Sequence, residues 1–540
     1  MMPLSDGRTL SVSTDHLRPL FVIVPGIVIG ASVTFILHAL SISDVIPLSA
    51  VFLFLLALLF VTPTLVVRSL KEYWLALFIL EFPFFLKKVL FKEAFGLDPT
   101  SSYNVLDDLG LPPGVLPAPV VHLSDLLFVV LLAQWLIRLA HREERLHIPG
   151  LFWLGSAYVA WSGLSILVSP VKAFAILEVV NRCKLLVIFL YFANNLASRK
   201  EVRRVVGLLI VGVAVQGALA SYQFAVQDIS SPFGKLLGIW TPSELTNTMT
   251  PVKNSTTSDE KPHYTVSGTD DSDLVRATGS VGSPNMQAQY FVSLMPLTFA
   301  MFCAASTLLS KAWYGLAFLL GTCGLLATFS RGGFAGFGVS MIVLLLLATY
   351  RRLLPGKVLA LAFIGGISAS PWAYAHLTTR PHYYDARFEL WEVVIPMIHD
   401  HPILGVGANN SVVAGVDYPD PWKVFRGIPF HNFYLTTASE TGLVGLGLFL
   451  FTFFWAAWAA FRTFRFHDQD PLLNWLSVGI PATLVGVGVH LSADQLAGEV
   501  NSLLIWITAG MAMALTFLRQ SADHNAAVPS IDRRFQPEAP

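Results

Sequence analysis

The sequence has few charged residues. Asp, Glu, Lys and Arg make up 13% of the 540 residues, whereas 54% are hydrophobic. Soluble domains carry roughly a quarter charged residues, so this composition excludes an ordinary soluble protein and indicates an integral membrane protein. The 35 Lys and Arg residues balance the 35 Asp and Glu residues. A net charge of zero argues against a nucleic-acid partner.

Cysteine is also scarce. The three cysteines, Cys183, Cys303 and Cys323, all fall within apolar runs. Because none lies in a long polar loop, neither a disulfide framework nor a cysteine metal site is expected. A convincing cleavable signal is missing as well. The first apolar run, at about 20–40, is long enough to cross a bilayer and lacks a clear cleavage site, so it is interpreted as a signal anchor.

Long apolar runs are abundant. A helix needs roughly 20 apolar residues to cross a bilayer, and about fourteen runs qualify. They lie near 20–40, 48–67, 72–90, 122–140, 150–168, 174–196, 203–226, 286–309, 312–328, 334–350, 356–375, 435–461, 473–491 and 502–519. The run at 72–90 is the weakest because it contains Glu81, Pro83 and two lysines, which leaves a re-entrant or interfacial segment open. The predicted fold class is an all-α, polytopic integral membrane protein with about 12–14 transmembrane helices.

Basic residues gather in short loops on one side of the predicted membrane. The positive-inside rule assigns this side to the cytoplasm. The residues are Arg68, Lys71, His141 to Arg145, Arg199 to Arg204, Arg351, Arg352, Lys357, Arg462, Arg465, Arg533 and Arg534. Two large polar loops, at about 227–285 and 376–431, then fall on the outer side.

Candidate functional residues lie where these outer loops meet apolar helices. His431 precedes an apolar helix, and its imidazole can take a proton from a sugar hydroxyl near neutral pH. A helix cap or a lipid-headgroup contact is the alternative. Arg331 lies in an outer turn, where its guanidinium can hold a phosphate by two hydrogen bonds or can instead reach the lipid headgroups. Glycines 332, 333, 336 and 338 allow neighbouring helices to approach closely.

Two further arginines lie beside the outer surface. Arg387 belongs to an amphipathic pattern, with Trp391, Val394, Ile395 and Ile398, that predicts a helix along the outer interface. Arg276 precedes Pro284, beside which Ser283 or Asn285 is predicted to start the next helix. Pairing of Arg276 with the aspartates at 270, 271 and 273 is the alternative.

Other ionisable residues have plainer interpretations. Glu178 and Arg182 lie four apart on one helix face and predict a structural ion pair, with help to an anion site as the alternative for Arg182. Glu440 is nine residues from His431, on the opposite helix face, and so is expected to contact a neighbouring helix. Asp494 and Glu499 are better candidates to orient the cationic site. The Asp271–Ser272–Asp273 spacing is assigned no metal.

The blocks 328–333, 387–391 with 401–407, and 431–435 with 440–445 resemble the O-antigen ligase and polymerase superfamily of bacterial envelope enzymes. Arg276, Gly279, Pro284 and Asn285 fit the same pattern. The resemblance implies a metal-independent, inverting glycosyltransferase without a cofactor, working on the periplasmic face of the inner membrane. The donor would be a glycan on undecaprenyl diphosphate. Arg331, Arg387 and Arg276 would hold the diphosphate, His431 would act on the acceptor hydroxyl, and Asn432 would fix the ring or the helix start.

The resemblance leaves the acceptor open. Ligases transfer a glycan to lipid A–core, polymerases extend a lipid-linked glycan, and other members attach glycans to protein. A chain-length regulator is a further expected partner of a polymerase. The spans before 120 and the long 227–285 loop depart from the shortest ligase-like layout. A transporter is the alternative of another class, although the polar groups gather at the outer face. A purely structural assembly protein would not require His431.

The runs and loops divide the chain into six predicted segments. They are 1–226, N-terminal transmembrane helices; 227–285, a partly disordered periplasmic loop; 286–375, transmembrane helices with the Ser-Arg-Gly motif; 376–434, a periplasmic catalytic loop; 435–519, C-terminal transmembrane helices; and 520–540, a disordered cytoplasmic tail.

Overall fold

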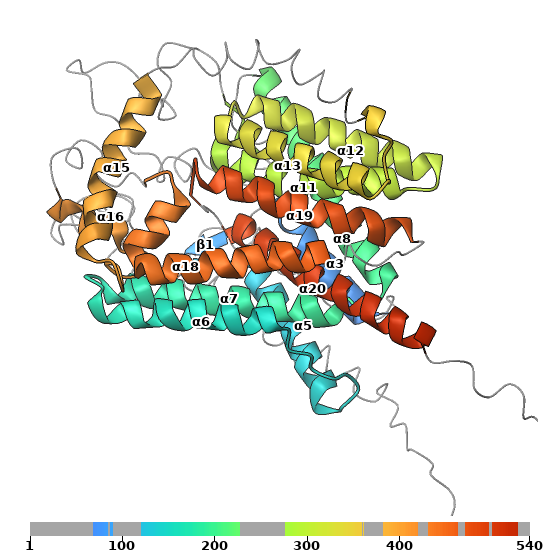
Figure 1. The fold of residues 1–540 in the computed structure, drawn as a ribbon, viewed down its shortest axis with the longest axis horizontal. Helices are drawn as coiled ribbons and strands as arrows, with labels where there is room; N and C mark the ends of the chain where they lie inside the picture. Colours follow the sequence, from blue (N-terminus) through green and yellow to red (C-terminus); the bar gives the residue numbers. More distant parts are fainter. Residues whose placement is uncertain are drawn as a thin grey trace, which may run out of the picture. The chain divides into compact units, whose positions relative to one another are not determined.

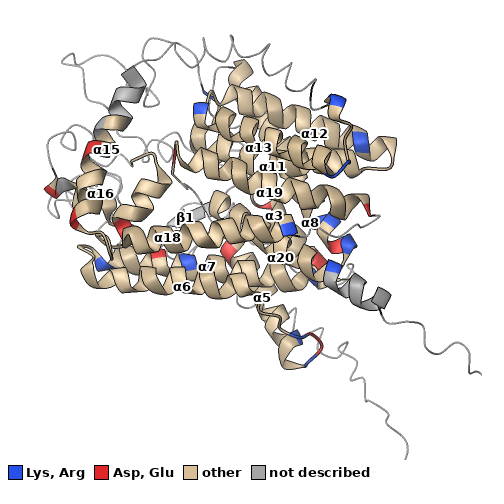
Figure 2. Ribbon diagram, viewed as in Figure 1, with Lys and Arg blue, Asp and Glu red and all other residues tan. Residues whose placement is uncertain are grey.

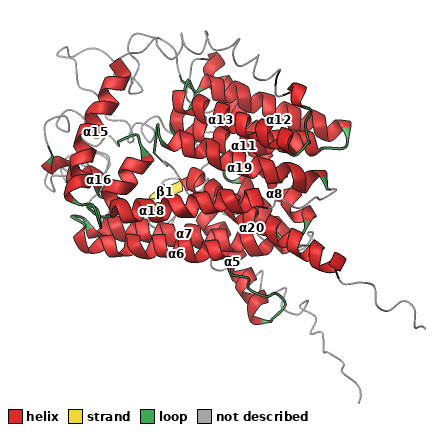
Figure 3. Ribbon diagram, in the orientation of Figure 1, coloured by secondary structure: helices red, strands yellow, loops and turns green. Residues whose placement is uncertain are grey.

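The described part of the chain is almost entirely helical (Figures 1 and 3). The computed structural model describes residues 69–84, 87–89, 120–226, 276–358, 360, 382–418, 430–462, 470–495 and 499–527. Within these residues the strands are two three-residue segments, β1 (Lys87–Val89) and β2 (Val120–His122), paired antiparallel. The predicted all-α, polytopic class is confirmed.

The chain forms two compact units. The smaller one contains most of α3 (Leu70–Leu80), the β1–β2 pair and α5 (Leu123–Ala140). Helix α5 is long and apolar enough to cross a membrane. Helix α3 is not, because its 11 residues reach about 16 Å against a hydrocarbon core of about 30 Å. The run predicted at 72–90 is therefore split between α3 and β1 and is not one membrane-spanning helix.

The larger unit holds the remaining helices. They are α6 (Gly150–Leu164), continued by the 3-10 turn η2 (Ser165–Val168), α7 (Lys172–Asn195), α8 (Arg199–Val226), α11 (Pro284–Ala304), α12 (Leu308–Ala327), α13 (Arg331–Tyr350), α15 (His382–Asp400), α16 (Ser411–Ala414), the 3-10 turn η3 (Gly415–Asp417), α18 (Phe433–Arg462), α19 (Pro471–Leu491) and α20 (Glu499–Ala527). Charged residues lie mostly near helix ends (Figure 2).

Eight helices of the described residues are long and apolar enough to span a membrane. They are α5, α6 with η2, α8, α12, α13, α18, α19 and α20. Helices α7 and α11 also match predicted spans in length and position. The runs at 20–40, 48–67 and 356–375 lie outside the described residues, so the total of 12–14 spans stays a prediction. Helix α20 continues to Ala527, past the predicted end at 519.

Helix α19 lies at the centre of the larger unit. It packs against both α11 and α13, while α12 packs against α8. In the most apolar 18-residue stretch of α19, 78% is buried inside the protein, compared with 22% in the corresponding stretch of α12. Helix α19 is thus shielded by other helices, whereas α12 leaves most of its surface for lipid.

Glycines bring α13 close to its neighbours. A Cβ atom on Gly333 would lie 2.5 Å from the Cβ of Ala288 in α11, and one on Gly336 would lie 2.7 Å from the Gly486 carbonyl oxygen in α19. Close approach through these glycines is therefore confirmed. Gly338 has open space around it, so the prediction was wrong at that position.

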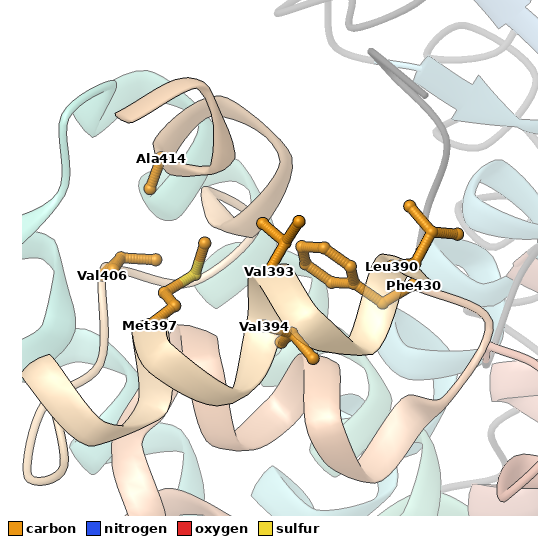
Figure 4. Packing of buried hydrophobic residues seen from close by; sticks show 7 residues of the cluster. All are labelled: Leu390, Val393, Val394, Met397, Val406, Ala414 and Phe430. Atoms are coloured by element: carbon orange, nitrogen blue, oxygen red, sulfur yellow. The ribbon is translucent and has the colours of Figure 1, made fainter. Parts of the chain in front are cut away.

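Helix α15 buries its apolar face in protein. Leu390, Val393, Val394 and Met397 form one cluster with residues of other segments, namely Val406, Ala414 and Phe430 (Figure 4). Ile395, grouped with this face by the sequence pattern, is 55% exposed. The helix therefore packs on the protein through one face and leaves its other face exposed, and its predicted place along the outer interface stays a prediction.

Candidate active site

His431 contacts Asp494, which follows α19. Nδ1 of the imidazole lies 3.0 Å from Oδ1 of the carboxylate. An ionised carboxylate only accepts hydrogen bonds, so the imidazole donates from Nδ1 and keeps its lone pair on Nε2. The histidine side chain is 24% exposed and the aspartate side chain 10%. The pair thus presents the second ring nitrogen at a partly open position. Asp494, one of the two residues predicted to orient the cationic site, lies beside this histidine, and its orienting role stays a prediction.

The backbone around His431 is held in an unusual conformation. Its φ is 48°, a region that costs a non-glycine residue about 1–3 kcal/mol. Hydrogen bonds of the next residue, Asn432, offset this conformational cost. The Asn432 side-chain oxygen accepts from the backbone N–H groups of Tyr434 and Leu435, at 3.0 and 3.1 Å. This amide caps α18, and its nitrogen donates to the Ser492 carbonyl at 3.1 Å, tying the helix start to the end of α19.

Asp494 is held in its ionised form. Burial by itself raises the pKa of this carboxyl group, but the hydrogen bond from His431, the charges of His431 and His490 and the backbone N–H of Gln495 hold the pKa below its ordinary value. The N–H of Gln495 lies 2.9 Å from Oδ1. The carboxylate therefore remains an acceptor for the imidazole throughout the neutral range.

Arg331 approaches the same place from α13. It is the first residue of that helix, after the capping Ser330, whose hydroxyl accepts from the Gly333 N–H at 3.2 Å. A Cβ on Gly332 would lie 3.0 Å from the Cβ of Ala493, the neighbour of Asp494. The first turn of α13 therefore packs directly beside the His431–Asp494 pair. A helix N-terminus with an arginine favours an anionic group.

Arg276 is fastened to the turn before Arg331. Its Nε donates to the Thr328 carbonyl at 2.9 Å, and its Nη2 donates to Oδ1 of Asn285 at 3.2 Å. Ser283, rather than Asn285, caps α11 by accepting from the Met286 N–H at 3.2 Å. Arg276 and Asn285 thus lie at the same end of the helix bundle as Arg331.

Arg387 lies on α15, and its side chain is outside the described residues. The helix that carries it is nevertheless linked to the histidine, because Nε1 of Trp391 donates to the Phe430 carbonyl at 3.3 Å. The packing of Phe430 against α15 (Figure 4) supports the same connection.

Arg182 is not in this group of arginines. Its Nε lies 2.8 Å from Glu178, its Nη1 donates to the Ser162 hydroxyl at 2.6 Å, and its Nη2 lies 3.7 Å from Glu440. The guanidinium also lies over the Tyr158 ring, 5.0 Å from its centroid. These contacts fit the predicted structural pair and leave little of Arg182 for an anion. Glu440 contacts a neighbouring helix, as predicted.

His490 was not among the residues predicted from the sequence. It is completely buried in α19, its protonated form would lower the pKa of Asp494, and its Nε2 would lie 3.9 Å from a Cβ on Gly332. The signal was present in the sequence, because an ionisable residue inside an apolar span is functional or paired by default.

Two comparisons with known proteins found similar sequences. Residues 316–450 match the family model described as O-Antigen ligase. A curated relative, the Exopolysaccharide production protein ExoQ of Rhizobium meliloti (strain 1021), is 29% identical over 164 residues, covering 29% of this chain and 36% of that protein. The match therefore spans about a third of the relative's length. The predicted resemblance to the O-antigen ligase and polymerase superfamily is confirmed, and the matched segment at 316–450 carries Arg331, Arg387 and His431.

Proposed function

We propose that the protein transfers a glycan from undecaprenyl diphosphate to an acceptor hydroxyl at the periplasmic face of the inner membrane. The observation that carries the proposal is the contact between His431 and Asp494, 3.0 Å long, beside the first turn of α13. This arrangement joins an oriented base to a cationic helix start, which is what attack by a hydroxyl and departure of a diphosphate require.

In the proposed reaction, His431 takes the proton of the acceptor hydroxyl on Nε2 as the oxygen attacks the anomeric carbon. The bond from that carbon to the diphosphate breaks, and Arg331 stabilises the negative charge left on the diphosphate. Arg276 and Arg387 complete the binding of the diphosphate. Direct attack from the opposite side inverts the anomeric configuration. Because arginines neutralise the leaving group, the reaction needs no divalent metal.

The acceptor is proposed to be either lipid A–core or a lipid-linked repeat unit. The relative's name, which refers to exopolysaccharide production, favours a polymerase that extends a lipid-linked glycan. The family description, O-Antigen ligase, favours the ligase. Transfer assays with purified donor and each acceptor in turn separate the two.

Substitution of His431 tests the enzyme against the transporter alternative. In proteoliposomes, His431→Ala should reduce glycan transfer by roughly 10²- to 10⁴-fold, while binding of the lipid-linked donor persists because the arginines remain. His399→Ala is the matched control, since that histidine is 88% exposed on α15. Transfer by His431→Ala at the wild-type rate would refute the base. Loss of donor binding together with transfer would place His431 in the anion site instead.

A further inference from the structure

Helix α18 turns back on itself at Gly442. This residue has φ 72° and ψ 177°, while the residues on either side are helical. Helical residues have ψ near −42°, so the chain changes direction here. The helix therefore consists of arm one, residues 433–441, and arm two, residues 443–462.

The two arms lie side by side. The ring centroids of Phe433 and Phe449 are 4.9 Å apart, whereas 16 residues of straight helix would separate them by about 24 Å. The Tyr434 hydroxyl donates to the Gly488 carbonyl at 2.6 Å, and a Cβ on Gly488 would lie 3.3 Å from the Phe453 ring. Arm one thus runs back along arm two and α19.

The turn is held by the segment that follows α15. Backbone hydrogen bonds run from Leu443 to Pro402, from Val406 to Ser439 and from Gly407 to Glu440, at 2.8, 2.8 and 2.9 Å. A Cβ on Gly442 would collide with the Ile403 carbonyl. Only glycine therefore combines this positive φ with this close contact.

Glu440 fastens the turn to two other parts of the protein. Its Oε1 accepts from the Ser411 hydroxyl at 2.9 Å, and its Oε2 lies 3.7 Å from Arg182 on α7. The residue is 7% exposed. Because a buried carboxylate requires partners, loss of its charge loosens the contact between arm one and α7.

Arm two has the length of one membrane crossing. Its residues, 443–462, form about 30 Å of helix, which matches the hydrocarbon core. A straight α18 would put His431 above the outer surface by the length of arm one, about 13 Å. Because arm one turns back, a turn at the outer surface would put His431 below that surface instead.

We propose that arm one is a re-entrant helix that lowers His431 to the boundary of the hydrocarbon core, and that Glu440 is a positioning residue for it. His431 then lies at the same depth as the diphosphate of a lipid-linked donor, where the lipid anchor of that donor begins. The acceptor hydroxyl binds at this depth. This catalytic consequence rests on the proposed function, whereas the path of the helix does not.

Cross-linking tests the path of the helix independently of activity. In a variant lacking Cys183, Cys303 and Cys323, a short bis-thiol reagent should join Phe433→Cys to Phe449→Cys. It should not join Phe433→Cys to Phe461→Cys near the other end of arm two. Nitroxide labels in membranes should report position 433 at the depth of 449 and below 443. A label at 433 that lies shallower than one at 443 would overturn the re-entrant helix.

Glu440→Gln tests the positioning role, with Glu178→Gln as the matched control. Both carboxylates contact Arg182, but Glu178 lies on the same helix as the arginine. Glu440→Gln should lower kcat at least tenfold with little change in donor KM, and a label at 433 should become more mobile. Glu178→Gln should change neither. Unchanged kcat in Glu440→Gln would reject its role, even where His431→Ala confirms the enzyme.

Discussion

His431 and Asp494 are 63 residues apart in the sequence, yet Nδ1 of the histidine and Oδ1 of the aspartate are 3.0 Å apart. The Phe433 N–H also donates to the Asp494 carbonyl at 3.0 Å. Asp494 therefore fixes both the imidazole and the backbone beside it, so the direction of Nε2 depends on a residue outside the family match at 316–450.

Removing the charge of Asp494 should impair transfer. Asp494→Asn keeps an oxygen at this position, but its amide can equally present a donor to the imidazole and so favour the wrong tautomer. Single-turnover transfer should fall by roughly 10²-fold or more, with donor affinity retained. Asp417→Asn, on an exposed carboxylate, is the control. A rate within twofold of wild type for Asp494→Asn would contradict the orienting role.

Asp494 should also make stability depend on acidic pH. Its folded-state pKa is lowered from an ordinary value of about 3.9. The stabilisation is therefore fully present above that ordinary value and is lost as pH falls through the folded-state pKa. Thermal unfolding in detergent, followed from pH 6 to the acid limit, should show a smaller acid-dependent decline in Asp494→Asn than in wild type. Identical declines would count against this contribution.

The arginines should act through geometry as well as charge. Arg276 donates from two nitrogens to two acceptors, which lysine cannot reproduce, so Arg276→Lys should raise the donor KM. Arg331→Lys should lower transfer by about 10²-fold, the typical effect of losing one stabiliser of developing charge. Arg351→Lys, at the other end of α13, serves as the control. Full activity in the double variant Arg331→Ala/Arg387→Ala would exclude the diphosphate site.

Two glycines of α13 provide a matched test of helix packing. Gly336→Ala places a methyl group against the Gly486 carbonyl and should destabilise the protein by about 1–3 kcal/mol. Gly338→Ala meets open space and should be neutral or stabilising by up to about 1 kcal/mol, because alanine favours helices. Thermal unfolding in detergent compares the two. Equal effects would show that close approach of α13 and α19 does not limit stability.

The sequence by itself determined the class of protein and the position of most helices. Apolar runs long enough to cross a bilayer are a local property, and water-free surroundings force their backbones into helices. The positions at which α11 and α18 begin also depend on nearby residues alone. Ser283 and Asn432 cap these helices by accepting hydrogen bonds from backbone N–H groups two or three residues further on. His431 and Arg331 could be selected for the same reason, since each lies at a boundary between a polar loop and an apolar run.

Only the tertiary structure decided which of these residues meet. The sequence spacing gave no sign that α18 turns back at Gly442, because a single glycine in an apolar helix rarely breaks it. The break depends on backbone contacts with residues 402–407, which arrive from a distant segment. Arg182 and Glu440 are likewise paired by helix packing rather than spacing. Hydropathy indicates whether a residue prefers lipid, protein interior or water. The site depends instead on contacts between helices that are distant in the sequence, and no local pattern encodes these contacts.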